Sequence, residues 1–516
     1  PEQTGRMNRQ VDYRTDLYSL GVVLFELFTG QLPFESTDAL ELIHAHIART
    51  PLPPDQIDAG IPGMVSDIIL KLLAKNAEDR YQTARGLKTD LEHCLEQWKN
   101  DKQVEHFELG RNDFTGKLQI PQKLYGREEE VKILLEACEK VTSGTTRLML
   151  VAGLSGIGKT ALVHEVQEPL IRKQGHYIEG KFDQYHHNIP YYSWGQAFGV
   201  LMNQLLMESD DNLNTWKTEL LEAVGPNGKV LIEVIPKLEQ IIGPQPAVPV
   251  LGGQEAQNRF NIVFRNFIKV IARKEHPLVI FLDDMQWTDA ASLSLLSVLL
   301  TDFDLAHFLI IGAYRNNEVD EAHPLTRSIT MLGQSQVNIE SIVLKNLSNE
   351  DINEICADSM HSSQAEILSL GQLIHSKTAG NPFFTHQLLY ILEAEQMLEF
   401  ETGNGHWQWD IDALKALDIT DNVVEFMSGR LQKLPPATQE LLKLGASIGN
   451  QFDLQTLGII AQESIDAINS ALQTALNLGV LIKPDKVYKF AHDRIQEAAY
   501  ELIPVTDRKS THLTIG

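Results

Sequence analysis

The chain has 516 residues, of which 43% are hydrophobic and 22% charged, and its formal net charge at pH 7 is −25. This length is too great for one hydrophobic core, so several domains are expected, and the ordinary composition excludes a disordered chain. The acidic charge disfavours nucleic acid and anionic membranes as partners. The three cysteines lack metal-binding spacing, and the sequence has no signal peptide or membrane-spanning run, so we expect a cytoplasmic protein.

The first part of the chain, residues 1–98, is predicted to be helical. Amphipathic patterns run over Asp16 to Thr29, Ala39 to Ile47, Val65 to Leu73 and Ala84 to Trp98. Prolines separate these patterns and mark the connecting loops. The pattern therefore predicts an all-α region.

Three motifs in this region occur in the order found in one known family. They are Pro1-Glu2-Gln3, the run DLYSLGVVLFELFTGQLPF that starts at Asp16, and Asp79-Arg80-Tyr81. Together they resemble the C-terminal lobe of protein Ser/Thr kinases. The resemblance implies that Glu2 forms a buried ion pair with Arg80 and that Asp16 supports the catalytic loop from behind. An unrelated helical bundle is the alternative.

The parts of a kinase that transfer phosphate are missing from the sequence. Phosphoryl transfer requires a glycine-rich loop, a strand lysine, a His-Arg-Asp loop and an Asp-Phe-Gly motif, and neither of the last two occurs in the 516 residues. The lobe is therefore predicted to be inactive by itself. Because the match begins inside the motif that follows the activation loop, we expect the active parts upstream of Pro1 in a longer parent chain.

After a polar, irregular stretch over residues 99–120, predicted to be a linker, the sequence turns to α/β patterns. The run Leu148 to Val151 reads as a buried strand, and a match to G-x-x-x-x-G-K-[ST] follows it. A helix is predicted next, continuing until Pro169. Strand, glycine turn and helix form the setting that a phosphate-binding loop requires, although a chance match to a glycine-rich turn is the alternative.

The chemistry of this loop assigns a role to each polar group. Backbone N–H groups surround the phosphates, Lys159 reaches the β- and γ-phosphates of ATP, and Thr160 binds Mg2+. The residues assigned to phosphate binding are Gly153, Ser155, Gly156, Gly158, Lys159 and Thr160. No N-K-x-D guanine motif occurs, which favours ATP over GTP.

Two carboxylates follow a second buried strand. Leu278 to Leu282 is continuously apolar, as in a parallel sheet, and Asp283 and Asp284 come at its C-terminal end, where α/β sheets place their ligands. Asp283 is predicted to orient the Mg2+ shell, and Asp284 to position or deprotonate the attacking water. A solvated Asp-Asp turn is the alternative. Since aspartate is shorter than glutamate, we expect slow hydrolysis.

Three more strands complete the predicted sheet. One covers residues 176–183, another starts at Phe308 and ends before Arg315, and a third runs from Ile339 to Leu347. Ser348 is predicted to cap the following helix.

The α/β region resembles the STAND branch of AAA-like ATPases. The segment Leu124 to Glu128 matches an "hh-G-R-E" element that lines the adenine pocket in that family, Arg315 occupies the γ-phosphate sensor position, and Pro382 matches a proline that packs near adenine. The residues so assigned to nucleotide binding are Tyr125, Gly126, Arg127 and Pro382. Ordinary helix capping, a structural arginine and a plain helix break are the respective alternatives.

Near the C-terminus two strands, at residues 479–483 and 487–491, flank a Pro484-Asp485 turn and suggest a winged helix. The preceding helix, Glu463 to Leu478, contains no lysine or arginine and so offers no cationic side chain to bind DNA phosphates. A regulatory or packing role is predicted instead. His492 either matches a nucleotide-sensing histidine of related switches or simply caps a helix.

The order of these parts resembles bacterial multi-sensor signal transduction multi-kinases. The expected fold is therefore multidomain: an all-α partial kinase C-lobe, an α/β P-loop ATPase with a helix-flanked parallel sheet, then helical and winged-helix subdomains. The predicted limits are 1–98, 99–120 (linker), 121–347, 348–432, 433–503 and 504–516 (linker). The expected function is an ATP·Mg2+-dependent switch with ATP hydrolysis, whose partners are other domains of the parent and other proteins. An oligomeric ATPase and a STAND-type transcriptional regulator are the alternatives.

Overall fold

The computed structural model describes residues 1–4, 11–36, 39–111, 113, 116–183, 189–335, 337–401, 406–415, 428–429, 431–483 and 487–515. The chain forms two compact units. The first comprises Pro1–Leu154, Gly158–Lys345 and Phe400–His406, and the second comprises Ser155–Ile157, Asn346–Glu399 and Trp407–Gly516. Three residues of the predicted phosphate loop thus group with the second unit.

The N-terminal part of the first unit is helical, as predicted. Its elements are η1 (Glu2–Thr4), α1 (Arg14–Thr29), α2 (Ala39–Ala48), α3 (Pro54–Ile57), α4 (Gly63–Leu72), η2 (Ala77–Asp79) and α5 (Ala84–Asp101). Helix α1 ends because Gly30 adopts a left-handed conformation with φ of 69°, which other residues rarely reach. Thr83 caps α5 by accepting a hydrogen bond from the Gly86 N–H.

A five-stranded parallel sheet forms the centre of the α/β part. Its strands are β1 (Thr146–Ala152), β2 (His176–Lys181), β3 (Leu278–Asp283), β4 (Phe308–Tyr314) and β5 (Ile339–Val343), in the order β2-β3-β4-β1-β5. All five strands were predicted, but β5 ends at Val343 rather than Leu347. Because all strands run parallel, their C-terminal ends lie at one edge of the sheet, where ligands bind in such folds.

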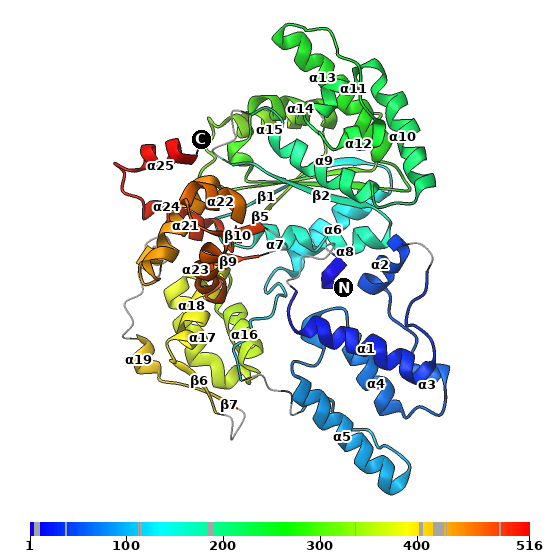
Figure 1. The fold of residues 1–516 in the computed structure, drawn as a ribbon, viewed down its shortest axis with the longest axis vertical. Helices are drawn as coiled ribbons and strands as arrows, with labels where there is room; N and C mark the ends of the chain where they lie inside the picture. The colour runs from blue at the N-terminus through cyan, green and yellow to red at the C-terminus, as the bar shows by residue number, and fades with distance from the viewer. Residues whose placement is uncertain are drawn as a thin grey trace. The chain divides into compact units, whose positions relative to one another are not determined.

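Helices cover both faces of this sheet. Figure 1 shows α6, α7 and α8 on one face and α9, α14 and α15 on the other. Their bounds are α6 (Glu128–Thr142), α7 (Lys159–His164), α8 (Gln167–Arg172), α9 (Tyr192–Leu205), α14 (Ala290–Leu300) and α15 (Pro324–Gln334), with the 3-10 turn η4 (Met285–Trp287) after β3. The sheet strands are consequently apolar on both faces, and β1 and β3 are buried over most of their length.

The helix after the glycine loop differs from the prediction. It was expected to run until Pro169, but α7 ends at His164 and Pro169 lies inside α8. Proline is tolerated there because it is the third residue of α8, where the missing N–H has no intrahelical acceptor.

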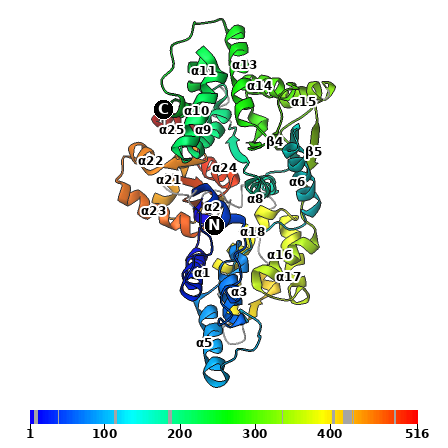
Figure 2. The same ribbon diagram turned by 90° about the vertical axis from the view of Figure 1, so that its right-hand side faces the viewer.

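A helical insertion connects β2 to β3. It contains α9, α10 (Asp210–Val224), η3 (Gly225–Asn227), α11 (Gly228–Ile232), α12 (Leu238–Ile242) and α13 (Gly253–Ile271). Figure 2 shows α9, α10, α11 and α13 gathered together. Buried aromatic rings pack edge to face between α9 and α13, with Trp194 and Phe198 centred 5.7 and 5.2 Å from Phe264. This packing fixes α9 beside the end of β2.

The second unit is mainly helical. Its first part contains α16 (Asn349–Met360), α17 (Gln364–Thr378), α18 (Pro382–Ala394), the hairpin β6 (Leu398–Glu401) and β7 (His406–Trp409), and α19 (Ile411–Lys415). Ser348 caps α16 as predicted, in a capping box with Asp351. The hairpin was not predicted.

The C-terminal part of the second unit combines helices with a small antiparallel sheet. Its elements are α21 (Pro436–Ile448), β8 (Gln451–Asp453), α22 (Leu454–Ala461), α23 (Ile465–Asn477), β9 (Leu481–Ile482), β10 (Val487–Phe490), α24 (Asp493–Glu501) and α25 (Arg508–Ile515). The two predicted strands pair as β9 and β10, β8 joins them in the order β8-β10-β9, and the predicted Pro484-Asp485 turn lies outside the described residues. This arrangement has the helices and wing strands of a winged helix. The domain limits stay predictions.

Candidate functional site

The glycine loop connects β1 to α7 at the C-terminal edge of the sheet. Gly156 and Gly158 have φ of 78° and 97°, a left-handed conformation that disfavours any side chain. Gly158 is the N-terminal cap of α7, so the loop delivers consecutive backbone N–H groups to a helix N-terminus. Such a turn suits a phosphate chain.

Lys159 lies folded within the loop that precedes it. Its side chain is largely buried, and its Nζ donates to the carbonyl oxygens of Gly153 (3.1 Å) and Leu154 (2.9 Å). Both acceptors are neutral, whereas an ammonium group bonds more strongly to an anion. A phosphate group that reaches the loop would therefore compete successfully for Lys159.

Thr160 and Asp283 bring the loop and β3 together. The Thr160 hydroxyl donates to Asp283 Oδ2 over 3.2 Å, although the two residues are 123 positions apart in the sequence. Hydroxyl and carboxylate oxygens are the ligands that Mg2+ takes from P-loop proteins, together with phosphate oxygens. The predicted metal ligands are thus adjacent, and their donor chemistry fits this ion.

Asp284 occupies a constrained position beside Asp283. Its backbone is left-handed, with φ of 54° and ψ of 45°, and the residue is only 3% exposed. A non-glycine residue held in this conformation costs on the order of 1 kcal/mol, which the surrounding structure must supply. Strain of this kind is concentrated at functional sites.

Among the residues that the structure describes, Gln286, Arg315 and Lys181 contact the Asp284 carboxylate. Gln286 Nε2 donates to Oδ1 over 2.8 Å, Arg315 Nε lies 3.6 Å from Oδ1, and Lys181 Nζ lies 3.1 Å from Oδ2. The Lys181 contact lacks hydrogen-bond alignment. One buried carboxylate therefore faces two cations.

Arg315 follows β4 and is itself held firmly. Its guanidinium pairs with Glu318 at 2.8 Å and lies over the ring of Trp287, 5.2 Å from the ring centre. Its backbone N–H donates to Gln286 Oε1 over 3.2 Å. The side-chain amide of Gln286 thus joins the end of β4 to Asp284. Arg315 lies beside the Asp284 carboxylate, and its role as a γ-phosphate sensor stays a prediction.

Sequence reasoning missed Lys181 and Gln286. Lys181 ends β2 and pairs in register with Asp283 of β3, so the strand order would have revealed it. Gln286 follows Asp284 by two residues in a turn whose conformation the sequence does not specify.

The predicted adenine element lies at the same edge of the sheet. Arg127 is 6% exposed and donates to the carbonyl oxygen of Lys345, just beyond β5, over 2.6 Å. Gly126 has φ of 59°, and Tyr125 is buried beneath Lys123, whose Nζ lies 4.6 Å from the ring centre. The hydrogen bond gives Arg127 a structural role, and its contact with adenine stays a prediction.

The middle of the glycine loop bonds to the start of α18. Asn381 Nδ2 donates to the Ser155 carbonyl over 3.1 Å, and the Phe383 N–H donates to the Gly156 carbonyl over 3.2 Å. Asn381 also caps α18, while Pro382 is the first residue of that helix. Asn381 thus makes a polar contact with the loop, and the packing of Pro382 near adenine stays a prediction.

His492, predicted either to sense nucleotide or to cap a helix, lies at the start of α24. Its Nδ1 accepts a hydrogen bond from the Arg494 N–H and caps α24, and its ring stacks on Phe383 with centres 3.9 Å apart. The capping alternative is therefore confirmed.

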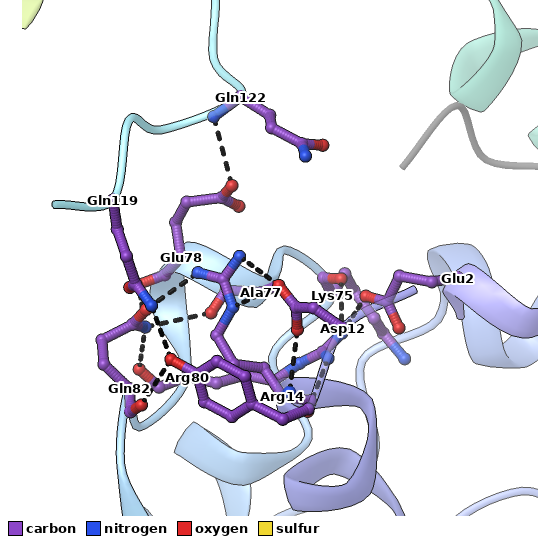
Figure 3. Close-up of polar contacts among 11 residues, drawn as sticks. Glu2, Asp12, Arg14, Lys75, Ala77, Glu78, Arg80, Gln82, Gln119 and Gln122 are labelled. Atoms are coloured by element: carbon purple, nitrogen blue, oxygen red, sulfur yellow. Dashed lines mark hydrogen bonds and ion pairs between the residues drawn. The ribbon is translucent and has the colours of Figure 1, made fainter. Parts of the chain in front are cut away.

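In the N-terminal helical region, Glu2 and Arg80 form the predicted buried ion pair (Figure 3). Arg80 Nη2 lies 2.6 Å from Glu2 Oε1, and the side chains are 0% and 2% exposed. Arg80 also donates to the carbonyl oxygens of Arg14, Ala74 and Lys75. Burial raises the pKa of Glu2, but hydrogen bonding and the charge of Arg80 outweigh this effect and hold the pKa below its usual value.

Comparisons with known proteins agree with this geometry. Residues 123–311 match the family described as AAA ATPase domain. Hybrid signal transduction histidine kinase G of Dictyostelium discoideum is 32% identical over 641 residues, covering 100% of this chain and 18% of that protein. Serine/threonine-protein kinase PknB of Mycobacterium leprae is 43% identical over 91 residues, covering 18% of this chain and 14% of that protein.

A solved STAND protein with a tetratricopeptide repeat sensor from Pyrococcus horikoshii is also similar. It is 13% identical with a TM-score of 0.41, and the match covers 77% of this chain and 45% of that one. Within the described residues, none of the helices combines the length and apolarity needed to cross a membrane.

Proposed function

Because this chain is a hybrid signalling-kinase-like protein that combines a partial Ser/Thr-kinase region with an AAA ATPase domain, we propose that it binds ATP with Mg2+ and hydrolyses it slowly as a switch. The observation that carries the proposal is the 3.2 Å hydrogen bond between Thr160 and Asp283, which joins the two motifs of a P-loop ATPase. The buried carboxylate of Asp284 lies directly beside this pair.

In the proposed site, the glycine loop and Lys159 bind the phosphates. The backbone N–H groups of Gly153 to Thr160 and the positive end of α7 attract the β-phosphate, and Lys159 exchanges its carbonyl acceptors for phosphate oxygens. Thr160 and Asp283 would hold Mg2+. That ion would supply positive charge that neutralises the phosphates.

Hydrolysis requires a group that orients water toward the γ-phosphate. Asp284 suits this role because Gln286 fixes Oδ1, whereas Oδ2 faces Lys181 without an aligned hydrogen bond and has lone pairs that can accept the hydrogen bond of a water. Arg315 lies beside the same carboxylate and can stabilise charge that develops on the phosphate. The Asp284 carboxylate accepts the proton of the water as the water oxygen attacks the γ-phosphorus, and the bond between that phosphorus and the oxygen bridging to the β-phosphate breaks, so that ADP and phosphate leave.

The nucleoside is proposed to lie along the segment Tyr125 to Arg127, as the STAND resemblance implies. Pro382 is proposed to contact the base, as the STAND resemblance implies. The position of Arg127 at the end of β5, near the start of the glycine loop, supports this arrangement.

The switch rests on the bonds between the loop and α18. Asn381 and Phe383 bond to the carbonyl oxygens of Ser155 and Gly156, so a change in the loop backbone on phosphate binding acts directly on the start of that helix. Because the Phe383 ring stacks on His492, which caps α24, a shift at the start of α18 can also move α24. The partners proposed for the switch are other domains of a larger signalling protein.

The kinase-homologous region is proposed to act as a scaffold in this chain. Its ion pair and helices match structural roles, and the sequence contains no His-Arg-Asp or Asp-Phe-Gly motif for phosphoryl transfer. Transfer of labelled phosphate to a protein by this chain would contradict the scaffold role.

The central experiment is a titration of ATP against wild type and Lys159→Ala. Loss of a hydrogen bond to a charged group costs about 1.5–3 kcal/mol, so affinity should fall by about 10- to 150-fold. Lys140→Ala serves as the control, because it removes an exposed lysine from α6, outside the loop. Equal affinity of wild type and Lys159→Ala would remove the phosphate-loop assignment. Asp284→Asn should bind ATP normally but lose hydrolysis, and removal of Mg2+ by EDTA should stop hydrolysis in wild type.

A further inference from the structure

The imidazole of His323 joins the start of α15 to the turn that carries Asp284. His323 is the N-terminal cap of α15, and its Nδ1 accepts a hydrogen bond from the Leu325 N–H over 3.2 Å. Its Nε2 lies 3.1 Å from the carbonyl oxygen of Gln286, in the turn η4 that follows β3. The side chain therefore bridges two segments that follow the neighbouring strands β3 and β4.

These two bonds define where the ring of His323 carries its proton. A backbone N–H can only donate, so Nδ1 is unprotonated, and a carbonyl oxygen can only accept, so Nε2 carries the proton. His323 is therefore a neutral imidazole with its proton on Nε2. Each ring nitrogen has a separate task, since Nδ1 caps α15 and the Nε2–H holds the carbonyl of Gln286.

Gln286 is held from both ends of the connection between β4 and α15. Arg315, the first residue of this connection, donates its backbone N–H to Gln286 Oε1 over 3.2 Å, and His323, the last, donates to the Gln286 carbonyl. The amide nitrogen of the same side chain donates to Asp284 Oδ1 over 2.8 Å. The side chain that contacts the carboxylate is thus fixed at its tip by Arg315 and at its backbone by His323.

The turn after β3 depends on such support. Asp284 is buried in a left-handed conformation, and strain of this kind persists only where the surrounding structure determines the conformation. Met285 contributes by packing its sulfur against Gly312 of β4, where a β-carbon would collide with it. The carbonyl of Gln286 lies near the end of η4, where carbonyl groups lack intrahelical partners, so the bond from His323 also satisfies an acceptor.

We propose that His323 is a positioning residue for ATP hydrolysis, because its Nε2–H fixes the backbone of Gln286 and so holds the side-chain amide against Asp284. The inference rests on the proposed function, since it assumes that Asp284 orients the attacking water. His323 touches neither nucleotide nor water in this scheme. Loss of its bond to Gln286 should therefore lower the rate of hydrolysis and leave the affinity for ATP unchanged.

Two substitutions separate the tasks of the two ring nitrogens. His323→Asn places an oxygen at the position of Nδ1 and keeps a good helix cap, but its side chain is too short to reach the Gln286 carbonyl. His323→Gln places an amide nitrogen about as far from the backbone as Nε2, but it has no acceptor at the position of Nδ1. His361→Asn is the control, because it makes the same chemical change at the exposed C-terminal end of α16.

The first variant is expected to lose rate, and the second to lose stability. His323→Asn should hydrolyse ATP about tenfold more slowly than wild type in single turnover, equivalent to about 1.4 kcal/mol, with a Kd for ATP within about twofold. His323→Gln should keep the rate within about threefold but melt at a lower temperature than His323→Asn. The order of the two variants in stability is then the reverse of their order in rate, which a merely structural histidine would not produce. His361→Asn should match wild type.

A double variant tests whether His323 acts through Gln286. Gln286→Ala removes the amide donor to Asp284, so the addition of His323→Asn should slow hydrolysis by less than about threefold further, because the two changes interrupt the same path. Independent sites would instead give the full loss of about tenfold in either background. That result would overturn the path through this side chain.

The inference is also overturned if His323→Asn hydrolyses ATP as fast as wild type while hydrogen exchange shows β3 and β4 intact, or if His323→Gln is as slow as His323→Asn. Either outcome leaves the proposed function standing, provided that wild type hydrolyses ATP and Asp284→Asn does not. Absence of hydrolysis in wild type would instead refute the proposed function together with the positioning role of His323.

Discussion

Gln286→Glu is the substitution that tests the site most sharply. It replaces one nitrogen by oxygen and keeps the shape of a side chain that is 6% exposed. The Arg315 N–H can still bond to the remaining oxygen, but the donor to Asp284 Oδ1, now at 2.8 Å, becomes a second carboxylate oxygen. The change is therefore confined to one hydrogen bond and one charge.

The expected loss of hydrolysis rate in Gln286→Glu follows from these contacts. A hydrogen bond to a charged group contributes about 1.5–3 kcal/mol, which corresponds to about a 10- to 150-fold lower hydrolysis rate if the bond positions Asp284 in the transition state. Repulsion between the two carboxylates adds to this loss. The Kd for ATP should change little, because Gln286 contacts neither the glycine loop nor Lys159 in the described hydrogen bonds.

The assay is single-turnover hydrolysis at saturating ATP, with binding measured separately. Gln334→Glu is the matched control, because it makes the same chemical change on the exposed side of α15 and should leave the rate unaltered. Hydrogen exchange of β3 and β4 shows whether the sheet is intact. A rate for Gln286→Glu within about twofold of wild type, with an intact sheet, would refute the positioning of Asp284 by this amide.

Two further predictions concern other parts of the chain. The pKa of Glu2 is held below its usual value in the folded state. The pair with Arg80 therefore stabilises the helical region at pH values above the ordinary carboxylate pKa, and this stabilisation is lost as the pH falls through the lowered pKa. Pulse proteolysis of that region should therefore show Glu2→Gln less stable than wild type near pH 7, with the difference vanishing at acid pH; a constant difference would contradict the ion pair as its cause. Asn381→Ala should lower the free energy of unfolding by about 1 kcal/mol, because α18 loses its N-terminal cap, and should abolish the ATP-dependent change in hydrogen exchange of α18. Asn381→Asp should restore the cap alone. An ATP-dependent change that persists in both variants would exclude Asn381 as the link between the glycine loop and α18.

Much of the fold could be predicted because its signals are local. The apolar runs of β1, β3 and β4 identified buried parallel strands, and the spacing from Gly153 to Thr160 identified the loop between a strand and a helix. The Glu2–Arg80 pair came from family resemblance and is confirmed by geometry.

The rest depends on contacts that the sequence does not contain. Lys181 and Asp284 are far apart along the chain and meet only because β2 and β3 are neighbours. The bond from Asn381 to the Ser155 carbonyl likewise depends on how α18 starts, and a short element such as β8 has too few residues to show a pattern. The assigned roles of Tyr125, Arg315 and Pro382 stay predictions, since position alone does not establish contact with a nucleotide.

The place of β1 inside the sheet affects how this protein can be divided. The stretch that matches the AAA ATPase domain ends at residue 311, within β4, and so excludes both the end of that strand and the whole of β5. A fragment cut there would leave β1, which normally pairs on both sides, as an exposed apolar edge. Such an edge invites pairing with other chains, so a fragment defined by the family match is an aggregation hazard, whereas one extended through Lys345 keeps β1 paired on both sides.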